Sequence, residues 1–175
     1  EYQREDIALL PPITNPSKII CVGLNYEDHR KETGRPEVKY PTLFTRFANT
    51  QIGHEAPMWL PNESAKLDYE GELAVVIGKG GRRISEEKAL DHVFGYSCYN
   101  DGSIRDWQRH TSQFTPGKNF PGTGAFGPWL VTADEISDPS SLALTTRLNG
   151  KEMQSATTDM MIFTIPKLIN YISTF

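Results

Sequence analysis

Glu72-Leu-Ala-Val-Val-Ile77 is a run of apolar and β-branched residues, and it is the stretch that decides the fold. Such a run, ended by the glycine-rich turn at residues 78–81, is typical of a buried strand that leads into a hairpin. Strands are also expected at residues 18–24, 42–47, 94–99, 129–132, 142–148 and 151–154, and short helices at residues 27–33, 86–92, 104–111 and 166–175. The sequence therefore predicts a mainly β, α+β protein with short helices.

Two local signals make this prediction more specific. Ser85 offers a side-chain cap for the helix at residues 86–92, and Asn149-Gly150 is a strong signal for a type I′ turn. Cys21 and Cys98 both occur in apolar, strand-like runs. We therefore expect two buried, reduced thiols rather than a disulfide.

Composition and charge exclude several classes of protein. The 175 residues are enough for one domain with a substantial core, and 18 Lys+Arg against 22 Asp+Glu give a formal charge of −4. No basic cluster is longer than Arg82-Arg83, so nucleic acid is not an expected partner. Apolar runs such as residues 160–163 fall far below the roughly 18 to 20 residues that cross a bilayer. With no apolar secretory core near the N-terminus, we expect a cytoplasmic protein without membrane partners.

Glu70 and Glu72 form the first candidate site. Residues two apart in a strand point to the same side, so both carboxylates continue an apolar face. Burying two like charges there is unfavourable unless a positive group lies between them, and Mg²⁺ or Mn²⁺ fits carboxylate ligands with open positions for a substrate. The alternative is a solvated pair at an exposed strand end, which is the commoner case for an arbitrary Glu-x-Glu.

Asp101 ends the next strong strand and is the natural third ligand if the two strands are neighbours. Asn100-Asp101-Gly102 could instead be only a turn. On a helix that begins near Asp101, Arg105 and Gln108 follow at i+4 and i+7, which places an acid, a guanidinium and an amide along one face.

Three further residues are catalytic candidates. His29 and Glu32 are three apart on a short helix, so the carboxylate could orient the imidazole as a base; a plain surface contact is the alternative. Lys118 lies in the glycine-rich stretch 116–122, where a flexible backbone could bring its ammonium near an anion, although most lysines are surface charges.

Several motifs together resemble one family. They are Cys21-Val-Gly-Leu-Asn-Tyr-Glu-Asp-His-Arg-Lys-Glu32, Asp68-Tyr-Glu-Gly-Glu-Leu-Ala-Val-Val-Ile-Gly78 and Asn100-Asp-Gly-Ser-Ile-Arg-Asp-Trp-Gln108, with 117–120, 127–132 and 148–150 in the same order. The chain resembles the fumarylacetoacetate hydrolase family, in the bacterial-type branch with acylpyruvate hydrolases, ureidoglycolate lyase-like and hydroxymuconate isomerase-like enzymes.

The resemblance implies a mixed β-sandwich roll that forms a homodimer. Residues 1–16 would be an N-terminal extension or linker, and residues 17–175 a catalytic domain that lacks its C-terminal part, since the family's Thr-Gly-Thr-Pro stretch is absent. A chain that begins without Met and stops inside a helical pattern is expected to be a fragment. Arg46 stands where many relatives carry Lys, so basicity is retained at that position.

The resemblance also assigns roles. Mg²⁺ or Mn²⁺ would bind Glu70, Glu72 and Asp101; His29 and Glu32 would lie on a lid; Lys118, Gln108 and Arg105 would hold the substrate. The expected function is a metal-dependent hydrolase or lyase of a 2-oxo or 2-hydroxy acid, such as an acylpyruvate, fumarylacetoacetate or a ureidoglycolate-like acid. It would act through a metal-stabilised enolate, with the His-Glu pair activating water. A hydroxymuconate-type isomerase or decarboxylase, or a non-catalytic metal-binding scaffold, are the alternatives.

Overall fold

The computed structural model describes residues 3–32, 34, 36–136 and 138–175 and divides the chain into two compact units. The side chains of Arg4, Asp28 and His29 lie outside this description. Unit 1 consists of Glu1–Cys21, Phe44–Ala74 and Ser97–Leu130, and unit 2 of Val22–Leu43, Val75–Tyr96 and Val131–Phe175. The expected division into an extension and a catalytic domain stays a prediction.

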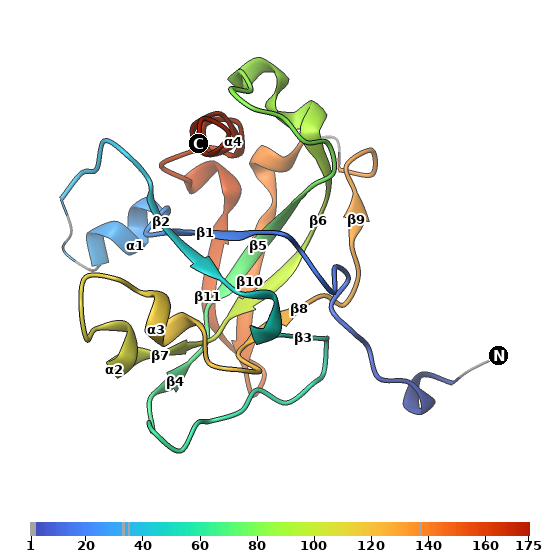
Figure 1. Ribbon diagram of the computed structural model, residues 1–175, viewed down its shortest axis with the longest axis vertical. Helices are drawn as coiled ribbons and strands as arrows, with labels where there is room; N and C mark the ends of the chain where they lie inside the picture. The colour runs from blue at the N-terminus through green and yellow to red at the C-terminus, as the bar shows by residue number, and fades with distance from the viewer. Residues whose placement is uncertain (1–2, 33, 35, 137) are drawn as a thin grey trace. The chain divides into compact units, whose positions relative to one another are not determined.

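Strands make up most of the elements and short helices lie between groups of them, as the sequence predicts for a mainly β, α+β protein (Figure 1). The strands are β1 (Ile19–Gly23), β2 (Thr42–Arg46), β3 (Gln51–Ile52), β4 (Leu67–Asp68), β5 (Gly71–Ile77), β6 (Val93–Asp101), β7 (Ser103–Ile104), β8 (Gly124–Phe126), β9 (Val131–Thr132), β10 (Ala143–Leu148) and β11 (Lys151–Thr157). The α-helices are α1 (Glu27–Glu32), α2 (Arg105–Gln108), α3 (Thr115–Lys118) and α4 (Ile165–Ile172), and the 3₁₀-helices are η1 (Arg4–Asp6), η2 (Ala48–Thr50), η3 (Glu86–His92), η4 (Pro139–Ser141) and η5 (Thr158–Met160).

The sheet of unit 1 fixes the end of β6. Strands β3, β8, β6 and β5 are neighbours in that order, with β3 parallel to β8 and β8 antiparallel to β6. Gly124 of β8 therefore lies opposite Asp101. A second antiparallel pair, β4 with β7, places Asp68 opposite Ser103. Two chain segments that carry acidic side chains thus meet at the same end of β6.

The interior of unit 1 is unusually polar. Ile104 and Phe126 are buried there, yet so are Arg46, Asp101 and Lys118, whose exposed fractions are 2%, 0% and 1%. Charged side chains are almost never fully buried without a partner, because desolvating them is costly. This concentration of charge identifies the part of unit 1 to inspect for a functional site.

Gly124 packs closely against this polar interior. A Cβ atom built on it would lie 2.2 Å from the Tyr99 hydroxyl and 3.0 Å from Arg46 Nη2. We expect Gly124→Ala to lower the free energy of unfolding by about 1–3 kcal/mol, the usual cost of overpacking. Urea denaturation measures the change, and Gly80→Ala is the control because a Cβ there meets nothing within 4 Å. Equal losses in both variants would contradict the close packing.

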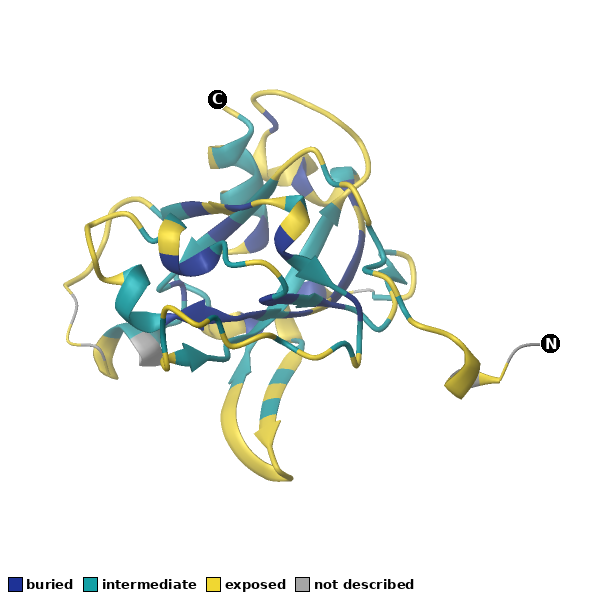
Figure 2. Ribbon diagram, turned by 60° about the horizontal axis from the view of Figure 1, so that its bottom comes forward, coloured by how far each residue is buried: buried dark blue, intermediate teal, exposed yellow. Residues whose placement is uncertain are grey.

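Unit 2 is held together by a different set of contacts. Helix α4 lies against the segment before η3, where Asn170 Nδ2 donates to the carbonyl of Ile84 at 2.6 Å. The first half of β6 pairs with β9. Strands β10 and β11 form an antiparallel hairpin whose side chains are mostly exposed (Figure 2). Asn149 and Gly150 both have positive φ, at 52° and 80°, which confirms the predicted type of turn.

Four sequence expectations need correction. Residues 78–81 contain only a bend at Lys79, and η3 intervenes before β6, so no tight hairpin follows β5. Ser85 is the N-cap residue of η3 but makes no capping hydrogen bond. The helix expected at residues 104–111 is only the four residues of α2. Cys21 and Cys98 are both free, but Cys98 is exposed, since the strand that carries it has side chains on two faces.

No described helix is long and apolar enough to cross a membrane.

Candidate metal centre

Three carboxylates meet where β5 begins and β6 ends. Glu70 directly precedes β5, Glu72 lies within it, and Asp101 is the last residue of β6. The Asp101 amide donates to the carbonyl of Glu70 at 2.9 Å, and the Glu70 amide donates to Asn100 Oδ1 at 3.1 Å. One oxygen from each carboxylate lies within 4.8 Å of the other two. The strands are neighbours, as the third-ligand prediction required, although Asp101 is on β6 and not on a helix with Arg105.

Asp101 is held by two buried cations. Arg46 Nη1 donates to Asp101 Oδ1 at 2.5 Å, and Lys118 Nζ donates to Oδ2 at 2.6 Å. Arg46 also donates to the carbonyl of Gly102 at 3.0 Å and to Thr123 Oγ1 at 2.8 Å. Sequence reasoning noted that Arg46 keeps a basic group at its position but did not place it in the site. Nothing in residues 42–47 shows that the last side chain of β2 reaches the end of β6.

Glu70 is held by a second pair of cations. Lys118 Nζ donates to its Oε2 at 2.8 Å and Arg105 Nη1 to its Oε1 at 2.5 Å. Burial would raise the pKa of Glu70, but the charges of Lys118 and Arg105 outweigh it and hold the pKa below its usual value. Burial also opposes the charge on Arg105, yet Glu70 and Asp68 raise the pKa of its guanidinium. Glu70 is therefore ionised in this arrangement.

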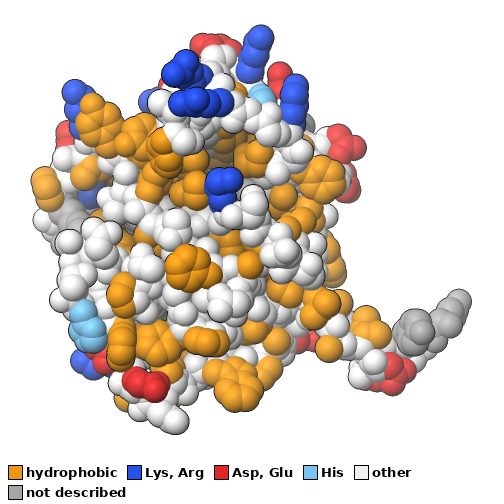
Figure 3. Space-filling model, in the orientation of Figure 1, with side chains coloured by type: hydrophobic (Ala, Val, Ile, Leu, Met, Phe, Trp, Pro, Cys, Tyr) orange, Lys and Arg blue, Asp and Glu red, His pale blue; other side chains and the backbone are white. Residues whose placement is uncertain are grey.

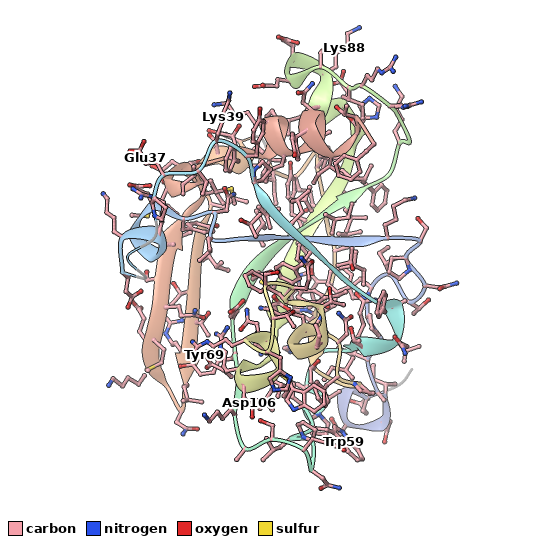
Figure 4. The ribbon with its side chains drawn as sticks, turned by 60° about the vertical axis from the view of Figure 1, so that its left-hand side comes forward. Glu37, Lys39, Trp59, Tyr69, Lys88 and Asp106 are labelled. Carbon is pink, nitrogen blue, oxygen red and sulfur yellow. The ribbon has the colours of Figure 1, made fainter. Side chains whose placement is uncertain are left out.

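Arg105 links the carboxylates to a wider polar network. Its Nε donates to Asp68 Oδ2 at 2.8 Å, and its Nη1 donates to Gln108 Oε1 at 3.0 Å. The sequence placed Arg105 and Gln108 on one face of a helix, and they are in contact there. It gave no sign of Asp68, because only the pairing of β4 with β7 brings that residue near α2. Figure 4 labels Tyr69 and Asp106, which are the chain neighbours of Glu70 and Arg105 and locate this region.

Glu72 differs from the other two carboxylates. No hydrogen bond or ion pair to it is found among the described residues, and burial, Asp101 and Glu70 together raise its pKa to about 8. Glu72 is a half-buried carboxylate beside two others and has no ion-pair partner among the described residues. A divalent ion bound there would balance its charge. The donor set of Glu70, Glu72 and Asp101 therefore fits Mg²⁺ or Mn²⁺.

The expectation that Lys118 brings its ammonium near an anion is confirmed. The ammonium lies between Glu70 and Asp101, whereas the positive group expected between Glu70 and Glu72 stays a prediction. Lys118 is, however, not on a flexible loop, since it ends α3, and Asn119 fastens this turn to β2 by donating to the carbonyl of Thr45 at 2.9 Å.

The other catalytic candidates belong to unit 2. His29 and Glu32 are both on α1, which confirms the predicted short helix. The His29 side chain lies outside the described part of the structure, and the Glu32 side chain is exposed. Their expected role as a base and its orienting partner stays a prediction.

Comparison with known proteins settles the family. The family model of the fumarylacetoacetate hydrolase C-terminal region matches residues 18–175. The chain belongs to the fumarylacetoacetate hydrolase family. Its fold agrees with this membership: 5-carboxymethyl-2-hydroxymuconate delta-isomerase from Mycobacterium smegmatis is similar with a TM-score of 0.86 and 34% identity, over 99% of this chain and 67% of that one.

Two further relatives bear on function. Oxaloacetate tautomerase fahd2, mitochondrial, from Xenopus laevis is 47% identical over 174 residues, which are 98% of this chain and 54% of that protein. A fumarylacetoacetate hydrolase from Exiguobacterium antarcticum has a TM-score of 0.85 and 40% identity, over 94% of this chain and 59% of that one. The chain spans about half the length of the curated relatives it matches. Because "mitochondrial" is part of several of their names, the expected cytoplasmic location stays a prediction.

Proposed function

We propose that this chain forms the metal-binding part of an enzyme that interconverts the enol and keto forms of a 2-oxo dicarboxylic acid of the oxaloacetate type. The observation that carries the proposal is the 47% identity to an oxaloacetate tautomerase across 98% of the chain. The carboxylate centre supports it, because Glu70, Glu72 and Asp101 offer the ligands such an acid's metal would need. The proposed activity is thus of the isomerase type, which the sequence alone offered only as an alternative to a hydrolase or lyase.

The chain's own residues divide the work. Glu70, Glu72 and Asp101 would hold Mg²⁺ or Mn²⁺, which when bound acts as a Lewis acid toward the substrate's oxygens. Arg105, with Gln108 against it, presents a guanidinium suited to a carboxylate. Lys118 supplies an ammonium for negative charge that develops on the substrate. In the net reaction one proton leaves C3 and one is added to the C2 oxygen, or the reverse, and we propose His29 with Glu32 for that transfer.

C–C bond hydrolysis is the second candidate. The similarity to the Exiguobacterium antarcticum fumarylacetoacetate hydrolase, at 40% identity, favours it specifically. In that case the His29 imidazole, oriented by Glu32, would activate water rather than move a proton on the substrate's carbon chain.

One assay separates the two candidates. The protein, purified with any sequence that naturally flanks this chain, is given oxaloacetate in its enol form with Mg²⁺, and loss of the enol absorbance is followed in the ultraviolet. We expect acceleration over the buffer rate, and we expect a chelator to abolish it. A parallel reaction with an acylpyruvate measures pyruvate release. Pyruvate release without any change in enol decay would favour the hydrolase, and no activity in either reaction would leave the scaffold as the better reading.

We also propose that the protein works as a homodimer. Figure 3 shows hydrophobic side chains spread over one face of the molecule. Among the exposed large hydrophobic residues of unit 1 are Trp59, Trp129 and Phe47, which are 71%, 67% and 55% exposed. Exposed aromatic side chains are typical of association surfaces.

A further inference from the structure

Lys118 occupies the space between two of the proposed metal ligands. Its ammonium lies 2.8 Å from Glu70 Oε2 and 2.6 Å from Asp101 Oδ2, and its side chain is buried. We propose that Lys118 is the built-in counter-ion of the metal-free site and that a divalent ion displaces it from Glu70 and Asp101. The proposal rests on the metal site described above.

The division of oxygens among the cations supports this role. Arg46 donates a hydrogen bond to Asp101 Oδ1, and Arg105 donates one to Glu70 Oε1. Lys118 donates hydrogen bonds to the remaining oxygen of each carboxylate, Asp101 Oδ2 and Glu70 Oε2. The oxygens of Glu70 and Asp101 that no arginine contacts, and that are thus best placed for an ion, are therefore the ones bonded to Lys118. A divalent ion at these positions and the ammonium would repel each other at contact distance, which favours departure of the ammonium when the ion binds.

The three cations also differ in how firmly they are fixed. Arg46 bonds to Asp101, to the carbonyl of Gly102 and to the hydroxyl of Thr123, so its guanidinium is tied at three points. Lys118 bonds only to the two carboxylates among the described contacts of its ammonium, although Phe44 lies beneath it at 5.1 Å from the ring centroid. A compact charge on a flexible four-carbon stem can leave, whereas a guanidinium locked by a fork of hydrogen bonds cannot leave as easily.

The backbone restricts the movement to the side chain. Asn119 accepts from the amide of Phe47 at 2.8 Å and donates to the carbonyl of Thr45, which fastens the end of α3 to β2. A Cβ on Gly117 would lie 2.3 Å from the backbone nitrogen of Gln108, so α3 also packs directly on α2. Displacement of the ammonium thus requires only new rotamers of Lys118. The released ammonium is then available for the substrate's negative charge, which couples substrate binding to metal loading.

The decisive variant is Lys118→Met, which keeps an unbranched apolar stem and removes the charge. Its affinity for Mg²⁺, measured by calorimetry after treatment with a chelator, should be at least about tenfold tighter than that of the unaltered protein, because the ion no longer breaks two charge-assisted hydrogen bonds. Without metal the variant should melt at a lower temperature than the unaltered protein, and saturating Mg²⁺ should raise its melting temperature by more. Lys66→Met is the matched control, since Lys66 is an exposed lysine of unit 1 and the charge change is the same.

A spectroscopic measurement keeps the proposal testable if the variant does not fold. In the unaltered protein, the side-chain ¹⁵N resonance of Lys118, assigned by its loss in Lys118→Arg, should shift when Mg²⁺ saturates the site. An unchanged resonance, or a Lys118→Met affinity equal to or weaker than that of the unaltered protein, would overturn the counter-ion role while leaving the metal site intact. Absence of Mg²⁺ binding to both the unaltered protein and Lys118→Met would overturn the metal site and the counter-ion role together.

Discussion

Glu72→Gln should weaken Mg²⁺ binding by at least about 100-fold and abolish metal-dependent turnover with it. Loss of a group that merely orients a metal ligand already weakens metal binding by about 10- to 100-fold, so loss of a ligand should have a larger effect. Glu72 is also the carboxylate with no cation partner among the described residues, so the ion is its natural partner. Calorimetric titration with Mg²⁺ measures the change.

The same substitution should not weaken the metal-free fold. Burial, Asp101 and Glu70 raise the pKa of Glu72 to about 8, so at neutral pH this carboxyl must take up a proton when the metal-free protein folds, which costs stability; a neutral amide of the same shape carries no such cost. We therefore expect a melting temperature in chelator equal to or above that of the unaltered protein. Glu63→Gln, at an exposed carboxylate of unit 1, is the control and should change neither quantity. Undiminished Mg²⁺ affinity in Glu72→Gln would falsify the proposed ligand set.

Asp101→Asn should produce the largest loss of stability. Asp101 is fully buried and pairs with Arg46 and Lys118. Removing its charge leaves the Arg46 guanidinium buried without its anion, and breaking a buried ion pair in this way typically costs about 3–5 kcal/mol. Urea denaturation of the metal-free protein measures the loss. Asp6→Asn, at an exposed aspartate of unit 1, should stay within about 0.5 kcal/mol of the unaltered protein.

A double-mutant cycle shows whether the loss arises from the pair. Arg46→Met combined with Asp101→Asn removes both charges, so the double variant should lose clearly less stability than the sum of the two single variants. Strict additivity would mean that the two side chains act independently. The metal-free state must be used throughout, since a bound ion would add its own stabilisation to each variant that can still hold it.

The secondary structure was largely readable from the sequence because it depends on local patterns. The apolar run of β5, the strand expected at residues 94–99 and the Asn149-Gly150 turn each depend on a few neighbouring residues, and all were found where expected. The failures occurred where neighbours decide the outcome. The Ser85 side chain makes no capping hydrogen bond at its N-cap position, and α2 is shorter than its polar pattern indicated.

The candidate site divides in the same way. Glu70 and Glu72 share a side by the two-residue period of a strand, and Arg105 and Gln108 are in contact because residues three apart in a helix are neighbours. The sequence alone placed each pair on one side of its element. Each pair lies within or directly beside one strand or one helix, so residue spacing along the chain is enough to predict it. The position of Asp101 at the end of the next strong strand, together with the family resemblance, made it the expected third ligand.

Only the tertiary structure decided which cations face the carboxylates. Arg46 and Lys118 are separated from Asp101 by many residues along the chain, and strand order and the packing of α3 bring them together. In the same way, Asp68 is far along the chain from its partner Arg105. Sequence spacing carries no signal for such contacts, because a side chain's partners across a core depend on strand order and register. The sequence thus predicted a carboxylate centre suited to a divalent ion, and the structure places the ammonium of Lys118 between Glu70 and Asp101 of that centre, where we propose that an ion displaces it.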